Sequence, residues 1–231
     1  MHSLLAHTKT KDELTAYLAH KVLGHANINE KNVVVAWRSH AEATHRQVEL
    51  SSIQEEADTK LILHSLDASS HGATSIRIHS PDTDVLVLAI RRYPYFCEDT
   101  CFVTGTAQKH RVIQLQPIYN ALGPNKAAAL PGFHALSGAD ITGRFAGKGK
   151  MTCWKVLQDL REDDKIVQAL AQLGAAEKPS KDLITSLEAF VCKLYLPNTE
   201  LTNIADVRWH LFKKKQAQSE ALPPTKAALR S

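Results

Sequence analysis

The chain has 231 residues, of which 44% are hydrophobic and 23% charged, and its formal net charge is +4 at pH 7. This length suits one sizeable α/β domain with a smaller helical part and argues against two equal domains. No apolar run approaches the roughly 18 residues of a membrane span, and the N-terminus lacks the pattern of a secretory signal. We therefore expect an intracellular, nuclear protein with no membrane partner, and the small net charge alone does not indicate nucleic acid.

Four cysteines, Cys97, Cys101, Cys153 and Cys192, are too few for a disulfide framework in a chain of this length. Cys97 and Cys101 have the spacing of a zinc-ligand pair, but no second pair follows. We interpret all four as ordinary thiols.

The first third of the chain predicts a helix, a strand and a second helix. Residues 11–23 place apolar side chains at helical spacing, with Gly24 as the expected end: Leu14, Tyr17, Leu18 and Val22. Residues 32–37 are largely β-branched and predict a strand buried on both faces of a parallel sheet. A capping box at Ser52 and Glu55 predicts a helix that runs to about Ser70 and ends at Gly72.

The middle of the chain continues this alternation, and the rest is helical. Residues 75–79 predict a strand, and residues 85–90 a buried helix that Pro81 and Asp82 introduce. Residues 100–104 and 111–115 predict two short strands around Gly105, as a hairpin or edge pair. The expected helices of the second half are 118–122, 125–136, 150–160, 165–173, 182–195 and 204–214.

Acidic residues fall at the ends of these elements. Asp82 and Asp84 directly follow the strand at 75–79, where ligands bind in open α/β sheets. Further carboxylates lie at the start of the capped helix and at the end of a later one: Glu55, Glu56, Asp58 and Asp140. Oxygen-rich groups of this kind suit Mg²⁺ or Mn²⁺. Two such metals about 4 Å apart can hydrolyse a phosphodiester, which is the natural use of the cluster.

Two considerations compete with this interpretation. Residues i and i+2 of a regular helix point in different directions, so Glu56 and Asp58 share a site only in a first turn, whereas Glu55 and Asp58 share a face. Acids also stabilise helix N-termini without binding any metal. That explanation covers Glu55 and Glu56 better than it covers Asp82, Asp84 and Asp140.

The three acidic groups together resemble the PIN-like superfamily, and within it the flap-endonuclease type of 5′ nuclease. Glu56-Ala57-Asp58 resembles the family's Glu-x-Glu motif, Asp82-Thr83-Asp84 its Asp-x-Asp, and Gly138-Ala139-Asp140 its Gly-Ser-Asp. The resemblance implies a three-layer, Rossmann-like parallel sheet with a C-terminal helical appendage. It also implies Glu56, Asp58, Asp82, Asp84 and Asp140 as ligands of Mg²⁺ or Mn²⁺, of which Asp82, Asp84 and Asp140 are catalytic.

The residues after Asp140 extend the likeness into the family's helix-two-turn-helix, where a Gly-x-Gly turn opens a helix against the DNA backbone. Gly147 and Gly149 permit a tight turn whose amides can meet a phosphate at a helix N-terminus. Arg144, Lys148 and Lys150 supply positive charge. We expect these five residues to bind nucleic acid, in the form of branched or single-stranded DNA.

Nearly the whole chain resembles a group of eukaryotic, transposon-associated proteins that carry this PIN-like domain. Five stretches carry the resemblance: 55–59, 80–86, 131–136, 147–150 and 222–225. It implies a nuclease-type domain over residues 1–140 and a helical appendage over residues 141–231. Nothing before Glu55 matches the family's first strand with its metal-binding Asp, so the chain resembles a fragment or a degenerate copy.

Three alternatives to an active nuclease remain open. One is a catalytically inactive scaffold that still binds nucleic acid or a protein. Another is a haloacid dehalogenase-like phosphatase, in which Asp82 would be the nucleophile of an Asp-x-Asp-Val motif. A glycosyltransferase Asp-x-Asp fits less well. We interpret three histidines, His64, His79 and His134, as ordinary core or surface residues. We interpret three tryptophans, Trp37, Trp154 and Trp209, as packing anchors and not as platforms for base stacking.

Overall fold

The computed structural model describes residues 8–29, 31–44, 57–106, 109–139, 143–214 and 221–230, and shows a mixed α/β protein. The chain divides into two compact units, residues 1–73 and 74–231. The predicted boundary between residues 140 and 141 lies inside the second unit. No helix in the described ranges has the length and hydropathy needed to cross a membrane.

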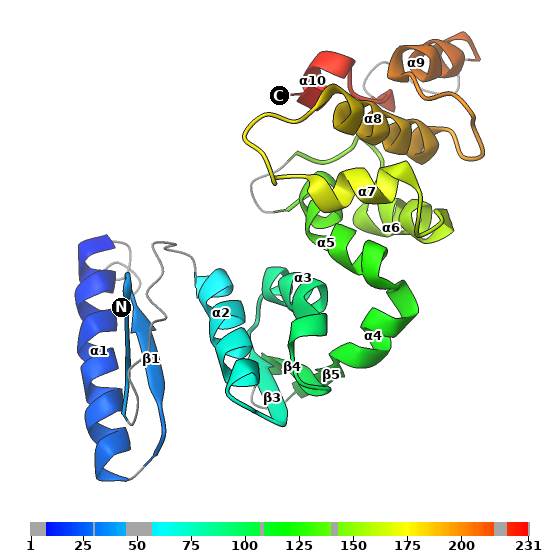
Figure 1. Cartoon of the computed structure of the whole chain (residues 1–231). Coiled ribbons are helices and arrows are strands. Elements are labelled where there is room, and N and C mark those ends of the chain that lie inside the picture. Colours follow the sequence, from blue (N-terminus) through cyan, green and yellow to red (C-terminus); the bar gives the residue numbers. More distant parts are fainter. Residues whose placement is uncertain are drawn as a thin grey trace. The chain divides into compact units, whose positions relative to one another are not determined.

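The first unit contains α1 (Thr8–Ile28), β1 (Val34–Trp37), β2 (His40–Ala43) and α2 (Ala57–Ser70), drawn in blue and cyan in Figure 1. The prediction of a strand buried in a parallel sheet is wrong here. β1 pairs antiparallel with β2, with Val34 opposite Ala43, and only Trp37 of β1 is buried. Arg38 has a φ of +50° in the connection, where the chain reverses. A β-branched run specifies a strand but does not specify its partner.

The structure also corrects the prediction for α1. The helix passes Gly24 and continues to Ile28, because one internal glycine costs only about 1 kcal/mol. The predicted apolar face is exposed, and the side chains that pack on Trp37 are instead Ala19 and Leu23, with Ala16 beside them. The small alanine side chains allow the large indole to lie close to the helix.

The end of α2 is as predicted. Gly72 has a φ of +83°, and its amide donates to the Ser69 carbonyl while the Ala73 amide donates to the Ala68 carbonyl. These two bonds satisfy carbonyls that the last helical turn leaves without partners. The predicted capping box at Ser52 and Glu55 lies outside the described residues.

The second unit is built on a three-stranded sheet in the order β3 (Ser75–His79), β4 (Asp99–Thr106), β5 (Lys109–Gln114). β3 pairs parallel with β4, and β4 forms the predicted antiparallel hairpin with β5. Gly105 has a φ of +102°, and a Cβ there would lie 2.1 Å from the Lys109 carbonyl oxygen, so the hairpin requires glycine. α3 (Thr83–Arg92) connects β3 to β4 through the short 3₁₀ turn η2 (Tyr93–Tyr95).

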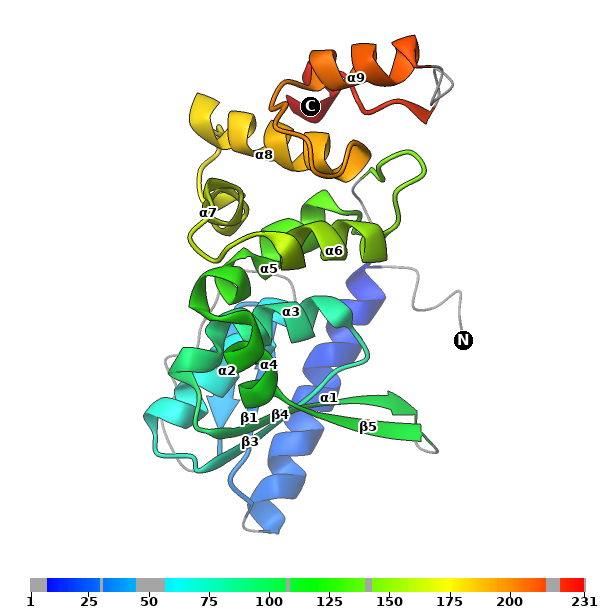
Figure 2. The same cartoon turned by 90° about the vertical axis from the view of Figure 1, so that its right-hand side faces the viewer.

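Seven helices follow within the described ranges of the second unit. The first six lie close to their predicted positions, and the seventh was not predicted: α4 (Leu115–Leu122), α5 (Pro124–Leu136), α6 (Lys150–Asp159), α7 (Lys165–Gln172), α8 (Lys181–Tyr195), α9 (Ile204–Lys213) and α10 (Lys226–Arg230). Figures 1 and 2 show α5 between α3 on one side and α6 and α7 on the other. The apolar core of α6 to α9 is therefore joined to the sheet-bearing part through α5.

Close contact between α5 and α7 depends on Gly132. A Cβ at this position would lie 2.0 Å from the Leu170 carbonyl oxygen and 3.1 Å from the Leu173 Cβ. Backbone atoms of α7 cannot move aside as a flexible side chain can. The absence of a side chain at Gly132 is thus what permits the two helices to pack at this distance.

A buried carboxylate, Glu188 of α8, joins three helices. Its side chain is 1% exposed, its Oε1 accepts a hydrogen bond of 2.9 Å from the amide of Ile204 at the start of α9, and its Oε2 lies 2.8 Å from Lys226 Nζ of α10. Because a buried charge is costly without partners, these two contacts are what make the position of Glu188 tolerable.

The four cysteines are free thiols, as predicted. Burial is the main cause that raises the pKa of Cys192 to about 11, and the negative charges of Glu188 and Asp206 add to it. Burial likewise raises the pKa of Cys153, although Lys148 and Lys150 lower it in part. Both thiols are protonated near neutral pH and are poor nucleophiles.

Candidate functional site

The predicted acidic pair lies at the carboxyl end of β3. Ser80 continues the strand, since its amide donates to the Val103 carbonyl, and its hydroxyl accepts from the amide of Asp82 at 3.0 Å. Asp82 is the N-cap of α3, and its Oδ1 accepts from the amide of Asp84 at 2.9 Å. Asp84 lies in the first turn of that helix. Asp82 therefore has a structural role whatever its chemistry.

Asp84 contacts a histidine of another helix. Its Oδ1 lies 2.7 Å from Nε2 of His134 on α5, and His134 Nδ1 lies 3.0 Å from Nζ of Lys150, the first residue of α6. The side chain of Asp84 is 46% exposed, whereas that of His134 is 14% exposed. A half-buried imidazole thus bridges the acidic pair and the glycine-lysine turn.

The imidazole of His134 contacts the two charged groups in different ways. Nε2 lies 2.7 Å from Asp84 Oδ1, within hydrogen-bonding distance of the carboxylate. Nζ of Lys150 lies 3.0 Å from Nδ1 and 3.4 Å from Nε2, so the ammonium group is close to both ring nitrogens. His134 therefore connects the acid and the base through its two contacts.

The predicted backbone-binding turn has the expected local geometry. The amide of Lys148 donates to the Phe145 carbonyl at 3.0 Å, and Gly147, with a φ of +67°, occupies the third position of this turn. Gly149 is the N-cap of α6 and supplies no side-chain cap. The N-terminus of α6 therefore begins at Lys150 and lies two residues after Lys148, so both lysines stand at the positive end of a helix.

Tyr195 of α8 contacts this turn through both its hydroxyl group and its ring. Its hydroxyl donates to the Ala146 carbonyl at 3.0 Å, and Lys148 Nζ lies 5.2 Å from the centre of its ring. Burial is the largest cause that raises the pKa of the Tyr195 phenol, and the nearby Cys153 adds to it. The phenol therefore remains a neutral donor, and the ring attracts the Lys148 ammonium group by a cation–π contact.

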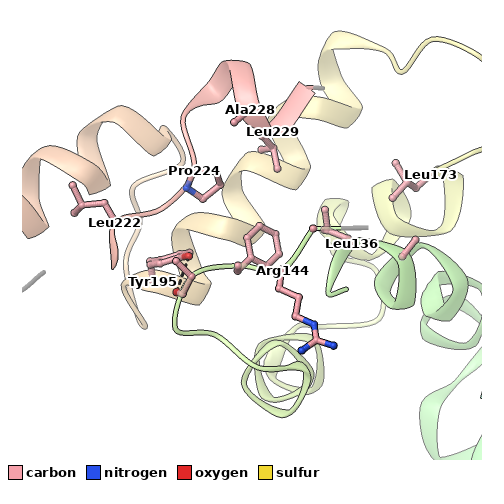
Figure 3. A pocket seen from close by; sticks show the side chains of 12 residues that line it. Leu136, Arg144, Leu173, Tyr195, Leu222, Pro224, Ala228 and Leu229 are labelled. Carbon is pink, nitrogen blue, oxygen red and sulfur yellow. Dashed lines mark hydrogen bonds between the residues drawn. The ribbon is translucent and has the colours of Figure 1, made fainter. Parts of the chain in front are cut away.

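A mostly apolar pocket of about 530 Å³ adjoins the turn. Figure 3 shows Tyr195, Leu222 and Pro224 on its wall, with the guanidinium of Arg144 pointing away from Pro224. The 222–225 stretch, which resembled the transposon-associated proteins outside any catalytic motif, therefore packs beside the loop that leads into the turn.

The structure places the remaining predicted residues as follows. Glu56 and Asp140 lie outside the described residues, and Asp58 lies in the first turn of α2, within the first unit. Arg144 is exposed in the loop before the turn, and its Cγ would be 2.9 Å from a Cβ at Gly138. Within the part of the chain that the structure describes, no three side chains of the metal-binding types form a cluster.

The structure adds to the interpretation of one residue and corrects that of another. His134 has contacts with Asp84 and Lys150 that the sequence did not indicate. Trp209 is not a packing anchor, because 65% of it is exposed, whereas Trp37 is buried and Trp154 contacts Phe133 edge to face. In the sequence, His134 directly follows Pro131-Gly132-Phe133, within one of the stretches that carry the resemblance. Its contacts with Asp84 and Lys150 could not be predicted, because both residues are distant from it in the sequence.

Comparison with known proteins gave no relative: no protein-family model, no curated protein and no solved structure matches this chain.

Proposed function

We propose that this chain is a PIN-like domain of the flap-endonuclease type that binds DNA and hydrolyses phosphodiester bonds with Mg²⁺ or Mn²⁺. The observation that carries the proposal is that His134 contacts both Asp84 and Lys150. It brings two motifs that are far apart in sequence, the Asp-x-Asp pair and the glycine-lysine turn, to one place. A phosphate that binds at the turn would then lie near carboxylates able to hold a metal.

Each part of this arrangement has a defined task in the proposed reaction. The N-terminus of α6, with Lys148 and Lys150, would hold a backbone phosphate. Asp82 and Asp84, with the predicted ligand Asp140, would hold the metal, which would activate water and stabilise the leaving oxygen. His134 positions both the Asp84 carboxylate and the Lys150 ammonium group.

A second candidate is an inactive scaffold that binds nucleic acid through the same turn. The observation that favours it is that Asp82 and Asp84 already have structural partners: Asp82 caps α3 and Asp84 accepts from His134. Both acids would be retained in a protein that no longer cuts. The turn and its lysines would keep their function in either case.

The test is a cleavage assay of the full chain on flap, nicked and single-stranded DNA, with Mg²⁺, with Mn²⁺ and with EDTA. Metal-dependent cleavage of any of these substrates supports the nuclease. Binding without cleavage by the wild-type chain retires the nuclease in favour of the scaffold. Hydrolysis of a small phosphate monoester, without cleavage of DNA, would instead indicate the phosphatase alternative.

Replacing both Lys148 and Lys150 with alanine should weaken DNA binding uniformly across sequences. Each lysine that neutralises a phosphate releases counterions, so we expect the slope of log affinity against log salt to fall by about 2. Fluorescence anisotropy over a salt series measures this. A double alanine variant at the exposed Lys178 and Lys181 is the control, and equal losses in the two variants would refute the placement.

Replacing His134 should show whether its side chain positions Asp84 and Lys150 or only fills space between the helices. His134→Phe keeps the volume but loses both hydrogen bonds, and we expect a 10- to 100-fold loss of cleavage, the usual effect of removing a group that orients a metal ligand. His134→Gln can still donate to Asp84 and accept from Lys150. Recovery of activity in His134→Gln is therefore expected from a cleavage assay at several Mg²⁺ concentrations. Equal activity of the two variants would show that the bridge has no role.

A further inference from the structure

Helix α9 has two apolar faces, of which only one is used for folding. Ile204, Val207 and Leu211 are buried in the core of the helical part. Trp209 and Phe212 point outward and are 65% and 59% exposed, and their rings stack with centroids 6.4 Å apart and planes 27° apart. We call this pair the α9 aromatic face. Since the helix is already anchored by its other side, the core does not need these two rings.

The surroundings of the α9 aromatic face are positively charged. Lys213 and Lys214 are exposed and form no ion pair with any described residue, and Asp206 is the single acid of the helix. Arg208 donates to the Pro223 carbonyl, a neutral acceptor, so it keeps its charge. Lys226 is nearby but pairs with Glu188. Arg208 lines the same hollow as the two rings, and Lys213 and Lys214 directly follow Phe212 in the chain.

A hollow of about 600 Å³ lies against this face and is lined in part by Arg208, Trp209 and Phe212. Leu222 belongs to its wall and also to the wall of the pocket beside the glycine-lysine turn. Leu222 is thus in contact with both hollows, while the lining of this one comes mainly from α9 and from residues just before α10.

We propose that the α9 aromatic face binds single-stranded nucleic acid by stacking unpaired bases on Trp209 and Phe212. Flat rings with cations beside them suit a ligand that combines aromatic faces with a negatively charged backbone, and every base offers such a face. An apolar protein surface would gain nothing from Arg208 and the two exposed lysines at the end of α9, which is why nucleic acid is the occupant that the charges favour. The site goes beyond the proposed cleavage function, because stacking requires no metal and none of the acidic residues.

The experiment is a titration of the full chain, in EDTA, with oligothymidylate and oligouridylate of about 20 nucleotides, followed by tryptophan fluorescence and by anisotropy of labelled strands. Stacking on Trp209 should quench its emission. Trp209→Ala should lose affinity about tenfold, as should Phe212→Ala, whereas Trp209→Phe should keep most of the affinity but lose the quenching. The two polymers distinguish DNA from RNA.

Tyr95→Ala is the matched control, since Tyr95 is also 65% exposed and lies beside two arginines, Arg91 and Arg92, at the end of α3. Unchanged affinity in Tyr95→Ala, with circular dichroism showing all variants folded, completes the supporting result. Wild-type affinity in both Trp209→Ala and Phe212→Ala would overturn the proposal. So would a loss of self-association in Trp209→Ala without a change in oligonucleotide affinity, because the face would then be a protein interface. Because EDTA removes the metal, failure of cleavage leaves this result unaffected.

Discussion

Asp82→Asn is expected to abolish metal-dependent cleavage while leaving the protein as stable as the wild type. Asparagine caps a helix about as well as aspartate, so the bond to the Asp84 amide is retained. It lacks the negative charge that a hard cation requires. We expect cleavage to fall by more than about 100-fold, the upper end of what the loss of an outer-shell partner costs. A cleavage assay and a thermal melt of the same sample measure the two effects.

Asp164→Asn is the matched control for this prediction. Asp164 caps α7 as Asp82 caps α3, with its carboxylate accepting from the Ile166 amide at 2.8 Å. We expect it to change neither stability nor cleavage. Asp82→Ala should in addition lose about 1 kcal/mol of stability, because the cap itself is removed. Full cleavage by Asp82→Asn would show that the carboxylate serves only the helix.

Gly132→Ala is expected to destabilise the second unit by about 1–3 kcal/mol, the range for overpacking of a well-packed core. The added Cβ would lie 2.0 Å from the Leu170 carbonyl oxygen, so α5 and α7 must separate. Separation would expose apolar side chains of both helices and would shift His134, only two residues away. Hydrogen exchange of the amides of α5 and α7, together with a thermal melt, measures this effect.

Gly24→Ala gives the opposite result and serves as the control. Gly24 also lies inside a helix, but nothing lies within 4 Å of a Cβ built there. Alanine should stabilise α1 by about 0.5–1 kcal/mol, because glycine loses more conformational freedom when it becomes helical. We expect amide hydrogen exchange to be slower in α1 of Gly24→Ala and faster in α5 and α7 of Gly132→Ala. Normal exchange in Gly132→Ala would mean that α5 and α7 tolerate a wider separation.

The sequence predicted secondary structure best where the apolar spacing agreed with the residues that begin or end an element. β3, the β4–β5 hairpin around Gly105, and the helices from α4 to α9 were each predicted close to their observed bounds. In these segments the apolar spacing, the caps and the glycines all favour the same element, and such consistency is the condition under which local patterns are reliable.

The first unit was predicted less well, for two physical reasons. The run that forms β1 specifies an extended strand, but its partner β2 (HAEA) has only four residues and contains alanine and glutamate, which are depleted in strands, so the hairpin was not visible. In α1 the large apolar side chains suggested one buried face, whereas the contact with Trp37 is made by Leu23 together with two alanines, Ala16 and Ala19. A small side chain gives a weak periodic signal even where it is the one that packs.

The candidate site was predictable residue by residue but not as an arrangement. The cap at Asp82 and the turn at Gly147 follow from local preferences that sequence expresses directly. The bridge by His134 does not, because Asp84, His134 and Lys150 meet only when α3, α5 and α6 are packed together. The exposure of Trp209 was hidden for a similar reason, since α9 is apolar on two faces and sequence does not say which one the core takes.

The pairing of Glu188 with Lys226 has a consequence for how the chain is made. A ribosome synthesises α8 well before α10, so during translation the Glu188 carboxylate exists without its cationic partner. Burying the Glu188 carboxylate without Lys226 would cost desolvation free energy that no ion pair offsets. Until Lys226 is present, the packing of α8 against α9 is therefore only weakly favourable. The helical part is therefore expected to assemble only after α10 has been synthesised, and so later than the sheet-bearing part.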